Sequence, residues 1–553
     1  MIHIEMIVEN VAAPELTFIL PDWRPGRYEL ASYVANIKSI HFNDSNEVEL
    51  NAHKIKTNQW VIETNKEKSV KVNYTYYAYK MDAGSSVVDD EQIYINFINC
   101  LLYAPGRQKE QTEVIVDIPD GFKSTCALIQ NDNSVYVASD YFELVDSPFL
   151  ASDSLKQLTY YSYEKEFNVY IQGDCPLDEG EVIAEFKKFT DYQIKQMRGF
   201  PTERYDFLIQ SLPYMHYHGV EHKNSTVLVL GPSDRSNKEK YREDLLGVAS
   251  HELFHTWNVT RIRPVEMSPY NFSMENYYET GFVTEGFTTY YGDLLLARSG
   301  VFSDEDYLKE LNTLFKRHFE NYGRHNLSLV DSSFDLWIDG YKKLLPGRKV
   351  SIYVKGAITS LMLDLSIRKK TLNESSLDDV VMDLWEGFGK ISKGYSKEDV
   401  YHIVRKYLKD EADHFIQEYY EGITPVEDEL TKLLDYIGCK LVVESHPETL
   451  ASLYGVRIEA KGERNLITEI VLDSAAEEYL SVGDEIMNLD EIKGAASENV
   501  SDSEFKLIRN TKQTRITLTP TEERFFGLYR IEKNDMASEQ AQSNYTVWIS
   551  GNH

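Results

Sequence analysis

Short runs of alternating apolar and polar residues dominate the first third of the chain and predict β-strands. The runs are rich in β-branched and aromatic residues, which favour strands, and they are Glu15–Leu20, Val70–Tyr79, Gln92–Ile98, Glu113–Ile118 and Phe167–Ile171. Turn residues separate them, as in the Pro-Asp-Gly sequence at residues 119–121. We therefore predict an all-β, sandwich-like N-terminal domain over residues 1–172.

Beyond this region the apolar positions take the spacing of a helix. Glu181–Met197 is amphipathic, and two strands follow at Tyr205–Ile209 and Ser225–Leu230. Further helices are predicted at Asp304–Tyr322, Gly356–Lys369, Leu377–Gly387 and Ser396–Glu421. We predict a mostly helical second domain over residues 173–425.

The pattern changes again near the C-terminus. Leu466–Leu472 reads as a strand, Asp473–Leu480 as a short helix, and Ser481–Leu489 as a turn and a strand. We predict a third, β-rich domain over residues 426–530 and a polar, partly disordered tail over residues 531–553. A chain of 553 residues exceeds one hydrophobic core, and the expected fold class is multidomain α+β.

The strongest chemical signal lies in the predicted helix 239–257, which contains no proline. His251 and His255 are four residues apart, so they share a helix face and can bind one zinc ion. Glu252 lies one residue round the helix, where it can act as a general base on a water molecule. The alternative is a helix that carries two histidines by chance.

Glu285 is the candidate for a third ligand, because a catalytic zinc usually has three protein ligands and one open position. It opens a second helical stretch that runs to Arg298. A His-His-Glu set is the one found in thermolysin-like enzymes, and such a set also accepts cobalt or manganese. The alternative for Glu285 is an acid in a first helical turn, where the helix dipole favours it.

Several motifs in order along the chain together resemble the glycyl aminopeptidase family of gluzincin zinc metallopeptidases. They occupy residues 21–28, 219–225, 251–258, 261–264, 284–291 and 353–356. The resemblance implies a thermolysin-like catalytic domain with one zinc ion per chain and a PDZ-like domain over residues 426–530. It also implies an aminopeptidase that prefers small N-terminal residues, glycine and alanine.

Roles for further residues follow from the same resemblance. Gly219 and Glu221 match the substrate-binding element in which the glutamate holds the free α-amine of the peptide, although His218 stands where the family more often has a second glycine. Tyr353 matches the tyrosine that donates a hydrogen bond to the oxyanion. For Glu221 the alternative is a solvent-facing strand residue.

In the PDZ-like domain, residues 453–456 are the candidate loop for binding a peptide C-terminus. Their Leu-Tyr-Gly-Val sequence departs from the usual Gly-Φ-Gly-Φ pattern. A purely structural module therefore remains an equal alternative.

The net charge and the hydropathy of the chain exclude some classes of binding partner. The formal net charge of −31 argues against nucleic acid and against anionic membrane surfaces. No segment reaches eighteen apolar residues, so no membrane span is expected. The strand-like start favours a cytoplasmic location, and a periplasmic protein whose signal peptide has been removed would look the same.

These observations predict a zinc-dependent aminopeptidase whose substrates are peptides with a free N-terminus. His251, His255 and Glu285 bind the metal, and Glu252 moves the proton. Two alternatives stay open: a zinc endopeptidase of the same chemistry, and an inactive peptidase-fold scaffold that binds peptides through its PDZ-like module.

Overall fold

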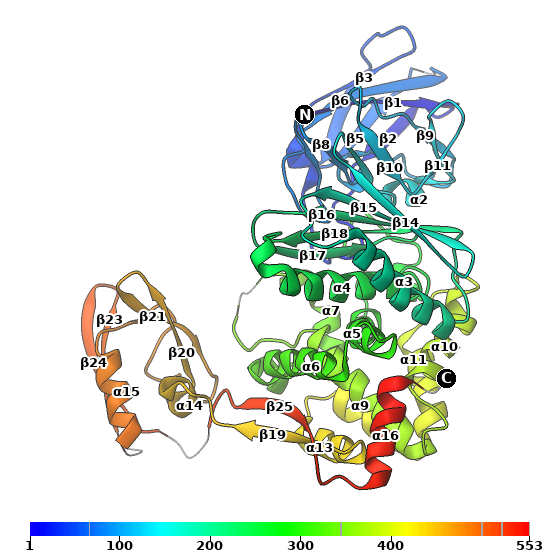
Figure 1. The fold of residues 1–553 in the computed structure, drawn as a ribbon. Helices are drawn as coiled ribbons and strands as arrows, with labels where there is room; N and C mark the ends of the chain where they lie inside the picture. Colours follow the sequence, from blue (N-terminus) through cyan, green and yellow to red (C-terminus); the bar gives the residue numbers. More distant parts are fainter. Residues whose placement is uncertain (66, 343–344, 499–501, 521–523, 552–553) are drawn as a thin grey trace.

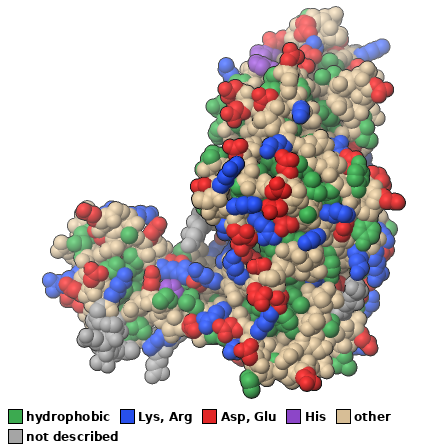
Figure 2. All heavy atoms as spheres, in the orientation of Figure 1, with side chains coloured by type: hydrophobic (Ala, Val, Ile, Leu, Met, Phe, Trp, Pro, Cys, Tyr) green, Lys and Arg blue, Asp and Glu red, His purple; other side chains and the backbone are tan. Residues whose placement is uncertain are grey.

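Figure 1 shows the computed structural model, which describes residues 1–551 except 66, 343–344, 499–501 and 521–523. The chain forms an elongated body with the N-terminal β domain at one end, and a small module projects from its side. Acidic and basic side chains are interspersed over the face of body and module in Figure 2. Charge therefore does not mark a binding surface on that face.

The N-terminal domain is built from small antiparallel sheets, because its strands are short and end at turn residues. One half has the strand orders β1 (Ile2–Glu9), β6 (Ser69–Tyr76), β3 (Ile37–Asn43), and β2 (Glu15–Ile19), β5 (Gln59–Glu63), β4 (Ala52–Lys56). The inward-facing residues Val70, Val72 and Tyr74 of β6 pack with Phe18 and Ile62. The alternating pattern of the sequence is thus the pattern of core contacts.

The other half of this domain lies next to the rest of the body (Figure 1). Its sheets have the orders β10 (Lys123–Cys126), β13 (Phe149–Ser152), β8 (Gln92–Ile95), β7 (Val87–Val88), and β11 (Ile129–Gln130), β12 (Tyr136–Ala138), β9 (Thr112–Val114). Two short helices complete it, α1 (Phe97–Cys100) and α2 (Tyr141–Val145).

A five-stranded sheet forms the middle of the molecule. Its order is β14 (Lys156–Ser162), β15 (Lys165–Gly173), β16 (Arg204–Ser211), β18 (Ser225–Gly231), β17 (His216–Glu221). Strands β15, β16 and β18 are parallel, and β17 is an antiparallel edge strand. Since β14 and β15 pair within this sheet, the N-terminal domain ends before β14 and not at the predicted residue 172.

The sheet is covered on both faces, which explains why β16 and β18 read as continuous apolar runs. Leu208, Val227 and Val229 pack against the N-terminal domain, where they contact the core around Tyr94 and Leu150. Phe207, Ile209, Leu228 and Leu230 lie in the large core on the other face. Helices α3 (Glu179–Gln196) and α4 (Lys238–Phe254) cover that face (Figure 1).

The remaining helices pack beneath α4. They are α5 (Thr288–Arg298), α6 (Asp304–Phe319), α7 (Leu329–Phe334), α8 (Leu336–Asp339), α9 (Val354–Thr371), α10 (Leu377–Leu384), α11 (Lys397–Leu408) and α12 (Ala412–Phe415). Helix α9 is buried around its whole circumference from Val354 to Arg368. Such a helix must be central, because a surface helix exposes one polar face.

The C-terminal segments differ from the predicted division of the chain. Helix α13 (Glu427–Tyr436), strands β19 (Cys439–Glu444) and β25 (Leu528–Lys533), and helix α16 (Glu539–Ser550) contribute residues to the core of the helical part. The predicted tail is therefore not disordered: Trp548 of α16 is fully buried, and its indole N–H donates to the Tyr290 hydroxyl at 2.9 Å.

The projecting module is smaller than the range 426–530. Its sheet has the order β20 (Val456–Lys461), β21 (Arg464–Ile470), β22 (Glu485–Ile486), β23 (Ser503–Arg509), β24 (Lys512–Leu518), with helices α14 (Thr449–Tyr454) and α15 (Leu489–Glu498). Residues 453–456 are not an open loop. Leu453 and Tyr454 end α14, and the Gly455 amide donates to the Ala451 carbonyl at 3.1 Å, so that amide is not available to a carboxylate.

The predicted multidomain α+β class is confirmed, with a β-rich N-terminal domain and a helical part that follows it. The four cysteines carry no disulfide. Of the helices that the structure describes, none combines the length and the apolar character that a membrane crossing requires.

Candidate active site

The two histidines of the predicted zinc helix lie side by side at its C-terminal end. His251 is in the last turn of α4, and His255 follows the helix directly. Their Nε2 atoms are 3.0 Å apart. The Nδ1 atom of His255 is 2.7 Å from the carbonyl oxygen of Asn258, so an N–H at this position fixes the ring with Nε2 facing the site.

Glu285 lies beside the two histidines, on a segment whose geometry was not predicted from the sequence. Residues Phe282–Phe287 form a π-helical turn that continues into α5, where a regular helix beginning at Glu285 was predicted. Oε2 of Glu285 lies 3.4 Å from Nε2 of His255 and 3.9 Å from Nε2 of His251. Such π turns are frequent at functional sites, because they redirect one side chain without ending the helix.

The donor set fits a divalent cation. His255 and Glu285 are buried, and Oε2 of Glu285 has no hydrogen-bond partner among the described residues. A buried carboxylate oxygen that makes no hydrogen bond and lies beside two imidazole nitrogens is costly unless positive charge lies next to it. Two nitrogens and one carboxylate oxygen are the ligands of a His₂Glu zinc site.

The electrostatics of the pocket agree with this fit. Burial lowers the pKa of His255, but Glu285, Glu221 and Glu252 outweigh it and raise that pKa to about 10. Burial raises the pKa of Glu252 well above its ordinary value, and Glu221 and Glu285 raise it further. Three carboxylates around one imidazole therefore strongly favour positive charge in this pocket.

Glu252 occupies a space that a glycine leaves open. A Cβ atom built on Gly219 would lie 2.2 Å from Oε1 of Glu252 and 2.7 Å from Cγ2 of Val248. Strand β17 therefore approaches helix α4 closely enough that only a glycine fits. Gly219 was predicted to bind substrate, and its observed contact is with the candidate base.

Glu221 lies at the end of β17 and faces the same pocket. Ligand oxygens of Glu221 and Glu252 and a ring nitrogen of His255 are all within 4.8 Å of one another. Glu221 is 6% exposed, so it is not the solvent-facing strand residue of the alternative interpretation. Burial raises its pKa, and the neighbouring Glu285 adds to the effect.

A glycine of the N-terminal motif at residues 21–28 also reaches this pocket. Gly26, in the turn of residues 23–26, has a φ of +75°, and a Cβ atom on it would lie 2.5 Å from Oε2 of Glu221. The signal in the sequence was a glycine after proline, which predicts a turn but not its tertiary contact. The N-terminal domain thus contributes one wall beside Glu221.

Tyr353 stands at the N-terminal end of α9. Gly356, three residues later, packs backbone to backbone on Gly286, because a Cβ atom on Gly286 would lie 2.6 Å from the Cα atom of Gly356. This contact brings the start of α9 against the π turn that carries Glu285. Burial raises the pKa of Tyr353 well above its ordinary value, with Glu285 as the next cause, so the hydroxyl keeps its proton and can donate it in a hydrogen bond.

Comparison with known families agrees with this architecture. Residues 1–153 match the M61 peptidase N-terminal domain, and residues 244–359, which include His251, His255, Glu285 and Tyr353, match the M61 glycyl aminopeptidase domain. The chain is a member of the M61 glycyl aminopeptidase family. It is accordingly a peptidase, and the predicted resemblance is confirmed.

One solved structure shares the fold of the whole chain. An aminopeptidase N family protein from Idiomarina loihiensis superposes on this M61 peptidase with a TM-score of 0.87 at 23% identity, over 99% of this chain and 97% of the other. An M1 zinc metallopeptidase from Deinococcus radiodurans matches with a TM-score of 0.46 at 12% identity, over 76% and 90% of the two chains. No curated protein matches the sequence.

The family match also bears on where the N-terminal domain ends. The matched N-terminal region ends at residue 153, and β14 of the central sheet begins at Lys156. In this M61 peptidase the sheet from β14 onward therefore belongs to the part of the chain that carries the site.

Proposed function

We propose that this M61 peptidase is a zinc-dependent aminopeptidase that removes small N-terminal residues from peptides. The observation that carries the proposal is the convergence of Glu221, Glu252 and His255 within 4.8 Å, deep in the body and next to Glu285. Glu285 is needed for metal binding and Glu252 for base catalysis. The third buried carboxylate, that of Glu221, is therefore available for a substrate ammonium group.

His251, His255 and Glu285 would hold one zinc ion per chain, and cobalt or manganese suits the same donors. When bound, the ion supplies Lewis-acid polarisation of the scissile carbonyl and makes water a better nucleophile. The two imidazole nitrogens and one carboxylate oxygen are the ligand set of catalytic zinc sites, which supports zinc as the resident metal.

The other steps belong to side chains of this chain. Glu252 takes a proton from the attacking water and delivers it to the leaving amine, so its carboxylate is regenerated in each cycle. The hydroxyl of Tyr353 donates a hydrogen bond to the carbonyl oxygen as negative charge develops there, a contribution typically of about 10²–10³ in rate. Glu221 accepts hydrogen bonds from the α-ammonium group, which fixes the first residue of the peptide in the site.

The preference for glycine and alanine rests on the family and on the crowding near Glu221. Gly26 and Gly219 mark two places where backbone approaches the carboxylates so closely that no side chain fits. A walled amine site accepts the end of a peptide and rejects its middle, which favours the aminopeptidase over the endopeptidase.

We assign the module of residues 449–518 a PDZ-like fold with a structural role, because the Gly455 amide is already paired within α14.

The test is product analysis of a short peptide that begins with glycine, offered with a free or an acetylated N-terminus to zinc-loaded protein. We expect release of glycine from the free peptide alone. Cleavage inside both peptides would establish the endopeptidase instead. No cleavage of either peptide, with peptide binding retained, would establish the scaffold.

Glu252→Gln tests the base in the same assay. We expect kcat to fall by about 10²–10⁴-fold, because the amide cannot accept the proton, while the zinc content measured by atomic absorption stays at one per chain. Activity of Glu252→Gln at the wild-type level would exclude Glu252 as the base.

A further inference from the structure

The strand that carries Glu221 has two faces with different partners. Gly219 and Glu221 face α4 and the catalytic pocket, whereas Val220 packs in the core shared with the N-terminal domain. Because side chains alternate along a strand, His216 and His218 lie on the face of Val220. They are therefore directed at the N-terminal domain, away from the metal ligands.

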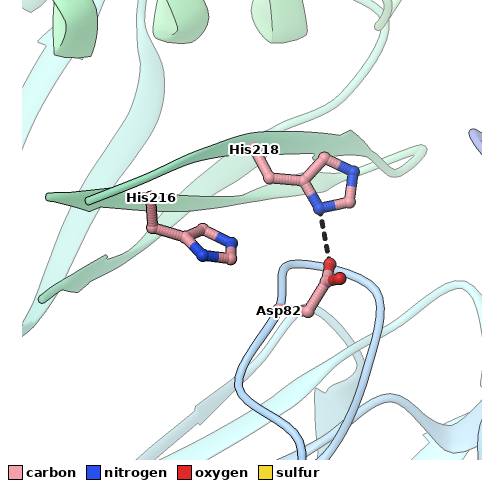
Figure 3. Close-up of side chains that lie close together, drawn as sticks. All are labelled: Asp82, His216 and His218. Carbon is pink, nitrogen blue, oxygen red and sulfur yellow. Dashed lines mark hydrogen bonds and ion pairs between the residues drawn. The ribbon is translucent and has the colours of Figure 1, made fainter. Parts of the chain in front are cut away.

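His218 meets a carboxylate of that domain. Its Nδ1 atom lies 2.5 Å from Oδ1 of Asp82, in the loop between β6 and β7 (Figure 3). The Gly84 amide donates to the same oxygen at 3.2 Å. The other carboxylate oxygen of Asp82 faces Lys80 at 3.4 Å and Arg27 at 3.9 Å. These contacts hold Asp82 in one orientation.

The loop of Asp82 is joined to the turn that touches Glu221. Arg24 is buried against Gly84, where a Cβ atom would lie 1.8 Å from its Nε atom, and its Nη1 donates to the Pro25 carbonyl at 2.9 Å. We call residues 23–28 and 80–86 together the two-loop brace. The brace contacts β17 at two places: Asp82 bonds His218, and Gly26 lies against Glu221.

Strand β17 needs such support. It is the edge of the sheet, and among the strands that the structure describes it pairs only with β18. An edge strand has backbone partners on one side only, so contacts of its side chains decide how far it lies from the pocket. A displacement of about 1 Å in a positioning element can cost about 10² in rate, so the placement of this strand matters to the reaction.

We propose that the Asp82–His218 hydrogen bond positions the amine-binding strand and so sets the affinity of the enzyme for the free N-terminus of its substrate. This inference rests on the proposed aminopeptidase function. His218 acts as a positioning residue through β17 and does not touch the substrate.

A metal ion is the competing interpretation of this cluster, because ligand atoms of Asp82, His216 and His218 lie within 4.8 Å of one another. The contact distances favour the hydrogen bond. At 2.5 Å, the Asp82 oxygen and the His218 nitrogen are too close to be two ligands of one ion, and Lys80 and Arg27 already balance the carboxylate. We therefore assign the cluster no metal.

The experiment compares His218→Ala and Asp82→Ala with wild type in steady-state cleavage of a glycine-initiated peptide. We expect KM to rise about tenfold, in line with the loss of a charge-assisted hydrogen bond, with kcat unchanged within about twofold. The inhibition constant of free glycine, which has the amine but no bond to cut, should rise by the same factor. His218→Asn, which can still donate to Asp82, should restore most of the affinity.

His216→Ala is the matched control, since His216 lies on the same face of β17 without a hydrogen bond to Asp82. It should behave as wild type, and the double variant Asp82→Ala/His218→Ala should be no worse than either single variant. Unchanged KM and glycine inhibition in His218→Ala, or a fall in kcat alone, would overturn the inference. A second equivalent of bound metal that His216→Ala removes would replace it with a metal site.

Failure of the proposed function gives a different result. Wild-type enzyme that cleaves acetylated and free peptides equally well would overturn the amine anchor together with its positioning. Normal preference for the free amine, combined with an unaltered His218→Ala variant, would overturn the positioning role alone.

Discussion

At the scale of single residues, the site depends on glycines as much as on ligands. Glu252 can occupy its position because Gly219 has no side chain, and Glu221 can occupy its position because Gly26 has none. Gly292 likewise lets α5 approach α4, since a Cβ atom there would lie 3.2 Å from Cβ of His251. Each of these glycines removes atoms from a place that a catalytic or ligand side chain requires.

Gly219→Ala should therefore lower activity without removing the metal. The new methyl group would displace the Glu252 carboxylate, and we expect kcat to fall by about 10–100-fold, with zinc content unchanged by atomic absorption. Gly247→Ala in α4 is the control, because its Cβ atom would have no neighbour nearer than 3.6 Å. Equal activity of the two variants would show that Glu252 tolerates the displacement.

At the scale of elements, one asparagine joins the two segments that carry the metal ligands. The side-chain amide of Asn258 donates to the Val283 carbonyl at 2.8 Å, the Thr284 carbonyl at 3.2 Å and the Thr288 hydroxyl at 3.0 Å. The backbone carbonyl oxygen of Asn258 is the hydrogen-bond partner of the His255 ring. Asn258 thus fixes the end of α4 relative to the π turn of Glu285.

Asn258→Ala should weaken both the fold and the metal site. Buried carbonyls would lose their donors, which costs about 1–3 kcal/mol in the free energy of unfolding, and zinc affinity should fall by about 10–100-fold. Urea unfolding and competition with a chelator measure the two effects. Asn326→Ala removes one exposed bond to the Arg348 carbonyl and should change neither; a wild-type zinc affinity in Asn258→Ala would contradict the role.

At the scale of the whole molecule, the C-terminal helix closes the catalytic part. Helix α16 places Trp548 among Tyr290, Tyr307 and Tyr545, and the Arg298 guanidinium donates to the Trp548 carbonyl at 3.2 Å. Tyr290 and Arg298 belong to α5, the helix that continues from Glu285. The end of the chain thus supports the element that carries the third ligand.

Trp548→Ala should destabilise this part by about 3–5 kcal/mol, because it leaves a large cavity in a closed core. A lower midpoint of thermal unfolding, followed by circular dichroism, is the expected result. Met536→Ala is the control, since Met536 is 90% exposed and its loss should change stability by less than about 0.5 kcal/mol. Equal midpoints for both variants would show that α16 does not contribute to the fold.

The sequence by itself determined what depends on local spacing. The four-residue interval of His251 and His255 places both on one helix face, whatever surrounds that helix. The alternating patterns predicted strands in the N-terminal domain, and the ordered motifs indicated the glycyl aminopeptidase family. The helix face and the strands follow from geometry that is local along the chain, and the family follows from residue types that recur in the same order.

Only the tertiary structure decided which distant residues meet. Gly26 reaches Glu221, Asp82 bonds His218, and α16 packs on α5, although nothing near these residues in the sequence indicates their partners. A turn or a polar helix has the same local pattern whether it is exposed or docked. Whether it is buried depends on how whole domains pack. That packing joins residues far apart in the sequence and produces no periodic pattern of apolar residues.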